Sequence, residues 1–419
     1  MSEKKSDIIY DCVVVGAGLA GLSQSLLLAK HGFKTLCLDA IPKDKALSPA
    51  YDGRTTALSY GSKQLMEACG LWEDIKPFAC PIKDIHIKDG PTPTLLQFLS
   101  DDVEGESFGW IVDNQLLRNE LYRAAFAQDG LNLLSGEIAK DFHFEDTYIH
   151  IHTSNKASFK GRILIGADGR QSAVRKALNI PVKAWEYGQT ALVFIAYHTR
   201  PHNNIAVEHF RDQGPFAVLP MTDSDETQAD GQPLYRSSVV WSEHDGPSFA
   251  DADEQTFLTA VNTRFGDYFG QVLKTGPRAR YPLRYQHAKS YTGHRTALIA
   301  EAAHAMHPIA GQGLNMSLRD VAALTELLVE AKDQGKDIGR PELLQRYERW
   351  RKPDNRAMGI ATDSLNRLFS NSTPGIRFIR NIGLEVVRLT PPAKGFFMKQ
   401  AMGKLGRLPK LIRGEKLHG

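Results

Sequence analysis

Cysteine is scarce in this chain, with only 4 among 419 residues. The four are Cys12, Cys37, Cys69 and Cys80, and no two of them have the CxxC spacing of a redox pair or a zinc site. The absence of this spacing argues against a disulfide reductase and against a small domain held together by disulfides. Reduced and mostly buried cysteines are what we expect of a cytosolic protein.

The sequence also lacks any run of 18 or more apolar residues, so no transmembrane helix is predicted. The first residues, MSEKKSDIIYD, lack the apolar segment of a secretion signal. Internal repeats and low-complexity segments are absent as well. We therefore expect a cytoplasmic globular protein, and the hydrophobic content of 42% is sufficient for a core.

Neither sign of charge dominates overall, because 51 basic residues stand against 48 acidic ones. The basic excess is concentrated in residues 351–419, which hold 14 Lys and Arg but 4 Asp and Glu. Phe, Leu, Ile and Met stand between these basic residues, a pattern that suits an anionic membrane surface or partner subunits. A solvated helical cap on the rest of the protein explains the pattern equally well. No nucleic-acid recognition motif is present, so we expect no nucleic-acid partner.

The hydrophobic pattern predicts the α/β class, with a Rossmann-like nucleotide-binding domain, an inserted β-sheet-rich domain and a helical C-terminal region. The first 40 residues are typical of a strand, a helix and a second strand, whereas the middle of the chain alternates apolar and polar residues as strands do. The predicted parts are a nucleotide-binding domain over residues 7–80, 111–178 and 286–350, a substrate domain over 81–110 and 179–285, and a basic helical region over 351–419.

The first motif is Gly16-Ala-Gly18-Leu-Ala-Gly21, which follows an apolar strand and opens a helix. Its glycines allow a tight turn, close approach of a pyrophosphate to the backbone, and close packing of helix on strand. The helix N-terminus offers unpaired N–H groups and a positive dipole end to the phosphates. Asp39 ends the next strand, where its carboxylate can accept hydrogen bonds from a ribose diol. The combination favours a dinucleotide site over an ordinary glycine-rich turn.

A second motif is Gly166-Ala-Asp168-Gly169, followed by Ser172 and Arg175. It ends a predicted strand and places a carboxylate at the edge where α/β sheets bind ligands. A plain Asp-Gly turn is common, however, and by itself the motif does not decide between the two interpretations.

The third motif is ALIAEAAHAMHPIAGQGLNMSLRD, residues 297–320. His304, His307 and Glu301 raise the alternatives of a metal site and of an acid–base cluster. Pro308 ends any helix at this point and no further ligand cluster is evident, which argues against a metal. A third interpretation is structural: small residues let the turn pack against a flat ligand, and Gly-Gln-Gly exposes N–H groups at a helix start, suited to an anionic reduced ring.

These three motifs in this order resemble the flavin-dependent aromatic monooxygenases of the para-hydroxybenzoate hydroxylase class. Within that class, HPIAGQGLN, DGRTTALSYGSKQLMEACGLW and SLNRLFSNSTPGIRFIRNIGLEVV are similar to segments of the ubiquinone-biosynthesis hydroxylases. The resemblance covers most of the chain. It implies FAD as the cofactor, so the predicted nucleotide-binding domain becomes an FAD-binding domain.

The resemblance also implies roles for particular residues. Pro308 would place its backbone carbonyl beside the flavin and the substrate, and no side-chain base is assigned. The residues implied in cofactor binding are Gly16, Gly18 and Gly21 at the pyrophosphate, Asp39 at the ribose, Arg54 and Arg118 near the cofactor, Asp168, Gly169 and Arg175 near FAD and the nicotinamide donor, Glu301 at the ribityl chain, and Gly311, Gln312, Gly313, Leu314 and Asn315 along the ribityl chain and isoalloxazine.

One departure from the family concerns the start of the third motif. The family has Gly-Asp where this chain has Ala300-Glu301, and the family aspartate hydrogen-bonds the ribityl chain. Glutamate keeps the charge but adds a methylene, and Ala300 adds a Cβ in a tight turn. A lost hydrogen bond to a charged group is worth about 1.5–3 kcal/mol, or about ten- to a hundredfold in affinity.

The resemblance implies hydroxylation of a polyprenylated phenol in ubiquinone biosynthesis, through a flavin C4a-hydroperoxide formed from O₂. A second GxGxxG motif in a nucleotide-binding context is absent, which fits a transient NAD(P)H donor, and a ferredoxin-type protein donor is the alternative. A membrane-resident substrate and the basic C-terminus favour a cytoplasmic protein peripheral to the inner membrane. Two further interpretations stay open: an FAD-binding prenyl-lipid reductase or cyclase, and a flavin-poor accessory subunit that binds prenylated quinone precursors.

Overall fold

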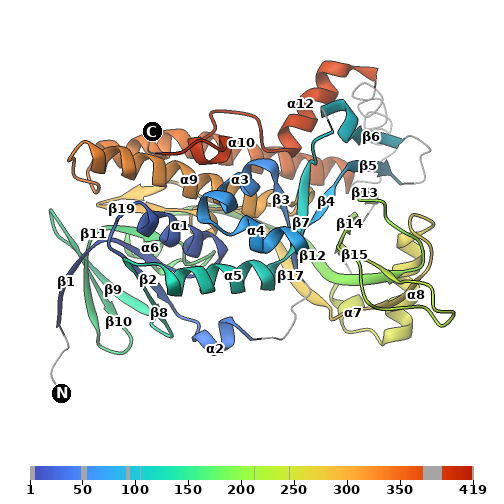
Figure 1. Ribbon diagram of the computed structural model, residues 1–419, viewed down its shortest axis with the longest axis horizontal. Helices are drawn as coiled ribbons and strands as arrows, with labels where there is room; N and C mark the ends of the chain where they lie inside the picture. Colours follow the sequence, from blue (N-terminus) through green and yellow to red (C-terminus); the bar gives the residue numbers. More distant parts are fainter. Residues whose placement is uncertain are drawn as a thin grey trace.

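The computed structural model describes residues 5–48, 54–90, 95–103, 105–211, 213–244, 246–370 and 389–417. Figure 1 shows a parallel sheet with its helices on the left and a second, largely antiparallel sheet on the right. A long helix pair runs along the top of the molecule. This is the α/β fold with an inserted sheet that the sequence predicts.

The parallel sheet has the strand order β18-β19-β11-β1-β2-β8, with β9 and β10 attached beside β11. Its central strands β1 and β2 pair in parallel, and β2 is buried along its whole length because helices or strands cover both faces. The helix α1 (Leu19–Lys30) follows β1 directly and packs against α9 (Gln312–Asp333). The strands are β1 (Lys5–Val15), β2 (Thr35–Asp39), β8 (Leu131–Ser135), β9 (Ala139–Phe144), β10 (Ile149–Thr153), β11 (Ser158–Gly166), β18 (Thr292–Gly293) and β19 (Thr296–Leu298).

The second sheet has the order β20-β17-β12-β15-β14-β13-β5-β6, with β16 beside β12. The two predicted parts of the substrate domain, residues 81–110 and 179–285, contribute strands to this one sheet, because β13 pairs in parallel with β5. One face is covered by α8 (Glu254–Phe265), a helix that the strand-like pattern of this region does not predict. The strands are β5 (Asp84–Asp89), β6 (Leu95–Leu99), β12 (Val182–His198), β13 (Ile205–Arg211), β14 (Gly214–Pro220), β15 (Tyr235–Glu243), β16 (Val272–Thr275), β17 (Ala279–Ala288) and β20 (His304–Ala305).

A small third sheet, β3-β7-β4, lies between the two larger ones (Figure 1). It comprises β3 (Thr55–Ser59), β4 (Cys80–Ile82) and β7 (Gly109–Asp113). The helix α3 (Tyr60–Cys69) starts directly after β3 and is capped by Ser59, whose hydroxyl accepts from the N–H of Ser62. Because β3 ends at Ser59, this residue stands at the boundary between strand and helix.

The boundary predicted at residue 351 falls inside one continuous helix, α10 (Pro341–Phe369). The change in charge does not mark a change in fold, because Arg351 is buried and ion-paired rather than part of a solvated tail. Residues 371–388, which carry much of the predicted basic and apolar tail, lie outside the described residues, as do Asp52 and Gly53 of the second family-like segment. The remaining helices are α2 (Lys43–Ala46), α4 (Trp72–Ile75), η1 (Lys76–Phe78), η2 (Ser100–Val103), α5 (Asn114–Ala127), α6 (Ala173–Ala177), α7 (Gly246–Ala250), η3 (Ala300–Ala302), η4 (Ile309–Gly311), α12 (Pro391–Ala401) and η5 (Lys410–Arg413).

Two apolar clusters flank the second sheet. On one face the α8 cluster packs helix against sheet and includes Val207, Val218 and Val239. The other face carries what we name the Ile309 cluster, whose buried members are Ile82, Leu96, Phe98, Phe108, Ile111, Ile195, Ala206, Phe210, Met221, Ile309, Phe369, Met398 and Met402. Among the described residues, none of the helices is long and apolar enough to cross a bilayer, and no three His, Cys, Asp or Glu side chains gather as metal ligands.

Candidate functional site

The glycine-rich loop after β1 is packed tightly against the rest of the parallel sheet. Gly16 has a φ of 105°, and its N–H donates to the carbonyl of Leu38 at 2.7 Å. A Cβ on Gly16 would overlap the carbonyl of Ala167, and a Cβ on Gly21 would overlap the carbonyl of Gly16. The packing of the protein itself therefore requires glycine at these two positions.

Gly18 differs from its two neighbours in the motif. It stands at the N-cap of α1 with extended backbone (φ −67°, ψ 175°), and no side chain caps the helix there. A Cβ on Gly18 would meet no atom within 4 Å. The start of α1 thus has open space at Gly18 and no side-chain cap, which fits a pyrophosphate at the helix start.

Asp39 closes the same loop from the end of β2. Its carboxylate accepts from the N–H of Ala17 and the N–H of Ile41, each at 2.6 Å. Burial raises the pKa of Asp39, while the two backbone hydrogen bonds and the charge of Arg118 oppose that shift. Each carboxylate oxygen keeps a second lone pair, so a ribose diol can still be bound.

The two arginines implied by the resemblance come from different elements. Arg118 lies on α5, half-buried, and acts electrostatically on Asp39. Arg54 precedes β3, and its guanidinium carbon lies 5.7 Å from the ring centroid of Tyr281 on β17. The structure therefore places Arg118 near the glycine-rich loop and Arg54 toward the second sheet.

The Asp-Gly motif forms the turn between β11 and α6. Asp168 Oδ2 accepts from the N–H of Ala173 at 2.6 Å and of Val174 at 3.2 Å, whereas Oδ1 is buried with no hydrogen-bond partner among the described residues. Burial raises the pKa of Asp168. Gly169 has a φ of 76° and open space where a Cβ would stand. An unpartnered buried acceptor beside an open turn fits a ligand hydroxyl or N–H.

Arg175 is buried and ties two motifs together. Its guanidinium donates to the carbonyl of Ala302 at 2.8 Å and to the carbonyl of Arg170 at 2.7 Å. Through these two hydrogen bonds the guanidinium of Arg175 holds the Asp-Gly turn against the turn at Ala300–Ala302. In this arrangement Arg175 positions the two turns.

The departure from the family pattern sits in a strained turn. Ala300 has a φ of 54°, in the left-handed region that glycine adopts readily and alanine does not. Its N–H donates to Oδ2 of Asp320 at 3.2 Å. The side chain of Glu301 is 53% exposed, and its carboxylate lies 3.5 Å from Nε of Arg170. Glu301 is therefore accessible to a ligand, with one weak ion pair to the protein.

A buried network beneath this turn was not predicted. The carboxylate of Asp320 accepts from Nε2 of His304 at 2.6 Å, Nε of Arg351 at 2.9 Å and Nδ2 of Asn355 at 2.9 Å. Burial raises the pKa of Asp320, but the charges and hydrogen bonds of His304 and Arg351 outweigh it and hold the pKa below its usual range. His304 thus supports the turn. One feature of the sequence could have indicated this network: the helical spacing of apolar residues in α9 places Asp320 on the buried face.

His307 is buried at the end of the turn, edge-on to Tyr187 with ring centroids 5.0 Å apart. Its Nδ1 accepts from the N–H of Ile309 at 3.4 Å, so the ring proton belongs on Nε2, which has no acceptor among the described residues. Burial lowers the pKa of His307 to about 4. The ring is therefore neutral at physiological pH and offers a single N–H donor.

The Gly-Gln-Gly segment forms the start of α9. The carbonyl of Pro308 accepts from the N–H of Gly311, which has a φ of 60° and is the N-cap of α9 without a side-chain cap. A Cβ on Gly313 would meet nothing within 4 Å, and Gln312 is buried. Leu314 packs against the main core. The N-terminus of α9 is thus a second helix start with open space beside it.

Asn315 serves a different purpose from the glycines before it. Its Oδ1 accepts from Ser59 N at 3.0 Å and Ser62 Oγ at 2.7 Å, and its Nδ2 donates to the carbonyls of Ala57 and Gly311 at 2.9 and 3.2 Å. Four bonds fill the capacity of an amide side chain. The Asn315 side chain therefore fixes β3 and α3 to the start of α9, and leaves no group for a ligand.

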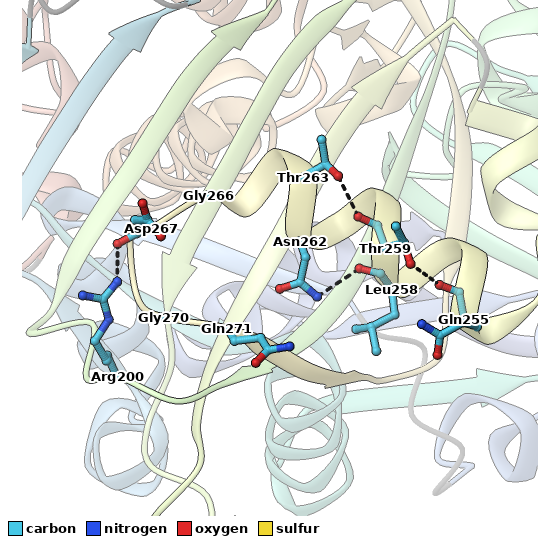
Figure 2. A pocket seen from close by; sticks show the side chains of 10 residues that line it. All are labelled: Arg200, Gln255, Leu258, Thr259, Asn262, Thr263, Gly266, Asp267, Gly270 and Gln271. Atoms are coloured by element: carbon cyan, nitrogen blue, oxygen red, sulfur yellow. Dashed lines mark hydrogen bonds between the residues drawn. The ribbon is translucent and has the colours of Figure 1, made fainter.

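A surface hollow lies elsewhere, beside α8 (Figure 2). Its polar side chains bond mainly to the protein, for example Thr263 to the carbonyl of Thr259 and Arg200 to the carbonyl of Asp267. It contains none of the predicted site residues, and it faces away from the Ile309 cluster across the sheet. It has no part in the candidate site.

Comparison with known proteins gives a consistent result. The chain matches the family described as FAD binding domain over residues 10–360. It is 38% identical to ubiquinone hydroxylase UbiL of Rhodospirillum rubrum, over 98% of this chain and 94% of that protein. It is 31% identical to human mitochondrial ubiquinone biosynthesis monooxygenase COQ6, over 94% and 92% of the two chains. The fold is shared with p-nitrophenol 4-monooxygenase PnpA from Pseudomonas putida, with a TM-score of 0.77, 18% identity, and coverage of 96% and 99%.

Proposed function

Because the chain belongs to the FAD-binding domain family, with ubiquinone hydroxylases among its relatives, we propose that it hydroxylates the aromatic ring of a polyprenylated phenol in ubiquinone biosynthesis. It is an FAD-dependent monooxygenase, and its co-substrates are O₂ and an electron donor. The observation that carries the proposal is the pair of uncapped helix starts, at Gly18 of α1 and Gly311 of α9, with open space at Gly18 and at Gly313 suited to the two parts of FAD.

We assign the residues of the first helix start to the adenosine half of the cofactor. The N–H groups at the start of α1 would bind the pyrophosphate, and Arg118 would add positive charge nearby. Asp39 would bind the ribose through its remaining lone pairs, and Asp168 would accept a hydrogen bond at its unpartnered Oδ1. Gly169 would allow the Asp-Gly turn to approach the cofactor closely.

The second helix start would hold the reactive half. Reduced FAD supplies the activation of O₂, and the N–H groups at the start of α9 would stabilise negative charge on the ring. Glu301 would hydrogen-bond the ribityl chain, since its carboxylate is exposed. Pro308 and Ile309 place this turn against the Ile309 cluster, and apolar side chains suit the prenylated ring of the substrate.

The electron donor is proposed to be NAD(P)H that visits transiently, with a ferredoxin-type protein as the alternative. The test uses purified protein loaded with FAD and a short-chain prenylated phenol. NAD(P)H consumption that needs O₂, together with a product heavier by one oxygen atom in mass spectrometry, supports the proposal. Flavin-loaded protein that leaves every such phenol unchanged with either donor would overturn it.

We further propose that α12 brings the enzyme to an anionic membrane surface, where a prenylated phenol resides. The side chains of Phe396 and Phe397 are 56% and 43% exposed, and Lys399 follows on the same helix. Apolar side chains with neighbouring lysines are typical of interfacial helices. Figure 1 shows α12 at the outer edge of the molecule, beside the sheet end of β5 and β6.

A flotation assay on vesicles that contain anionic lipid tests this surface. Truncation after residue 388 is unsuitable, because it removes Met398 and Met402 from the buried core. The double variant Phe396→Ser and Phe397→Ser leaves the core intact and should float less than the parent chain. Phe78→Ser, at another exposed phenylalanine, is the matched control. Equal flotation of parent and double variant would remove α12 from the proposal.

A second function, a flavin-poor accessory subunit that binds prenylated quinone precursors, is favoured by one observation. Ala300 occupies a backbone conformation suited to glycine, beside a glutamate in place of the family aspartate. Both features bear on cofactor retention. The absorbance spectrum of the purified protein separates the two functions, because flavin bands support the enzyme. Colourless protein that takes up no FAD on reconstitution supports the accessory subunit.

A further inference from the structure

Glu208 is a carboxylate in the interior of the second sheet. It lies on β13 between Ala206 and Phe210, and all three side chains share one face of the strand. Ala206 and Phe210 both belong to the Ile309 cluster. Glu208 therefore projects from the sheet into the apolar region that adjoins the turn at Pro308.

The strand register places Glu208 in an otherwise apolar row. Glu208 is opposite Ile87 of β5 and Ala217 of β14, and the row continues through Val240 of β15 and Val193 of β12. Side chains directly opposite one another in a sheet lie on the same face. Glu208 is thus the only ionisable side chain among these five described residues.

The two faces of the sheet differ in how completely they are closed. On the α8 face Val207, Val218 and Val239 are fully buried, at 2%, 0% and 0% exposure. On the opposite face Glu208 and Val240 both keep partial exposure although they lie mid-sheet. The described side chains therefore leave part of this row exposed, which is the opening that a ligand would use.

The uncovered row is connected to the start of α9 through β3. Thr55 of β3 donates from its hydroxyl to Ser238 Oγ at 2.7 Å, and Ser238 lies two residues before Val240 on the same face of β15. Ala57, two residues further along β3, lies next to Gly311, where a Cβ would approach it to 3.1 Å. A substrate on this row would therefore lie between the sheet and the turn assigned to the flavin.

Glu208 has no hydrogen bond and no ion pair with any described residue. Burial alone raises the pKa of Glu208 to about 7, with no charged neighbour among the causes. The titratable and charged side chains that share this face of the sheet or border the cluster are Asp89 on β5, Tyr197 on β12, Arg236 on β15, Tyr281 on β17 with Arg54 beside it, Tyr60 at the start of α3, and His307 before Ile309. An unpaired carboxylate in apolar surroundings opposes folding, so a structural role does not explain it.

On the basis of the proposed function, we propose that Glu208 is a catalytic base that accepts the proton of the phenolic hydroxyl of the substrate. In this step the phenolic O–H bond breaks and an O–H bond forms on a carboxylate oxygen of Glu208. The electron pair stays on the substrate oxygen and enriches the ring carbons ortho and para to it. No electron is gained or lost, and the proton passes to solvent after the product leaves.

The test compares Glu208→Gln, Glu208→Asp and Glu208→Ala with the parent enzyme, all loaded with FAD. General base catalysis contributes about 10²–10⁴-fold, so we expect kcat for hydroxylation to fall by that factor in Glu208→Gln. The FAD affinity and the substrate KM should change less than threefold. Glu208→Asp should recover part of the rate, and acetate should restore part of the rate of Glu208→Ala by occupying the vacated space.

The pH profile gives a readout that a structural role would not produce. The parent rate should rise with pH through about 7, where Glu208 loses its proton, and this limb should be missing from Glu208→Gln. Glu254→Gln, at an exposed residue of α8, is the control and should keep the parent profile. A Glu208→Gln enzyme with the parent kcat and the parent pH limb overturns the assignment while the hydroxylase function stands.

Thermal stability supplies a measurement that does not depend on activity. A carboxyl group whose pKa is raised in the folded state destabilises the fold as pH rises from about 4, its unfolded value, through 7. Glu208→Gln should therefore raise Tm above that of the parent at pH 8, and the gain should shrink toward pH 5. A parent enzyme that binds FAD yet hydroxylates no phenol contradicts the proposed function and the role of Glu208 together. Tm differences that do not vary with pH contradict the unpaired state of Glu208.

Discussion

The backbone N–H of Ala300 donates to the buried carboxylate of Asp320 across 3.2 Å, with Ala300 held at a φ of 54°. The same carboxylate oxygen accepts from His304. One buried aspartate on α9 therefore fixes a backbone conformation that alanine adopts at a cost, in the turn that precedes the predicted flavin contacts. The strain and the network that maintains it lie at the same place.

Replacement of Ala300 by glycine should stabilise the protein. A left-handed conformation costs a residue with a Cβ about 1–2 kcal/mol, and the extra chain entropy of glycine offsets about half of that gain. We expect the free energy of unfolding, measured with a chemical denaturant, to rise by about 0.5–1 kcal/mol. Ala302→Gly is the matched control, because Ala302 is buried in the same turn without a positive φ and should lose stability instead. Equal effects of the two variants would argue against strain at Ala300.

Replacement of Asp320 by asparagine should destabilise the fold in a pH-dependent way. Removal of one partner of a buried ion pair costs about 3–5 kcal/mol, and here buried Arg351 loses Asp320 and keeps the half-buried Asp354 as its remaining charge partner among the described residues. The pKa of Asp320 is lowered in the folded state, so its contribution is present above about pH 4 and is lost as pH falls through the lowered pKa. The difference in unfolding free energy between parent and variant should be constant from pH 5 to 8 and should shrink below about pH 4. A difference that grows in acid would contradict this account.

Gly18 and Gly21 should respond to alanine in opposite ways. Gly18→Ala adds a Cβ that meets no protein atom, so the apoprotein should keep its Tm while FAD binds at least about tenfold more weakly. Gly21→Ala adds a Cβ that overlaps the carbonyl of Gly16, so the apoprotein itself should lose stability. Flavin fluorescence titration and thermal unfolding of the apoprotein measure the two effects. Unchanged FAD affinity in Gly18→Ala would move the pyrophosphate away from this helix start.

Replacement of Glu301 by aspartate should tighten FAD binding. The shorter side chain restores the residue type that hydrogen-bonds the ribityl chain in the family, and a hydrogen bond to a charged group is worth about 1.5–3 kcal/mol. That corresponds to about ten- to a hundredfold in the Kd for FAD, measured by fluorescence quenching. Glu342→Asp, at an exposed position of α10, should leave the Kd unchanged. Unchanged or weaker binding in Glu301→Asp would count against the placement of Glu301 at the cofactor.

Much of the FAD-binding half was predictable because its signals are local. The strand, glycine loop and helix around Gly16 follow one another directly, and the helix start predicted at Gly-Gln-Gly is observed at the beginning of α9 (Gln312–Asp333). Glycines mark both helix starts, since a tight turn or a positive φ limits the choice of residue. The predicted domain boundary at residue 351 rested on a count of charged residues. Such a count cannot distinguish the buried, ion-paired Arg351 from an exposed lysine, so it could not show that one helix continues through this position.

The sequence by itself determined the order of the motifs, the class of the fold and the residues at the ends of strands, since each depends on neighbours a few positions away. Only the tertiary structure decided which groups these residues meet. It assigned Arg175 to a carbonyl of the next motif and used all four hydrogen bonds of Asn315 within the protein. It also placed the side chain of Glu208 in a row of apolar side chains, because the face on which a strand residue lies depends on its register with strands far away in the chain.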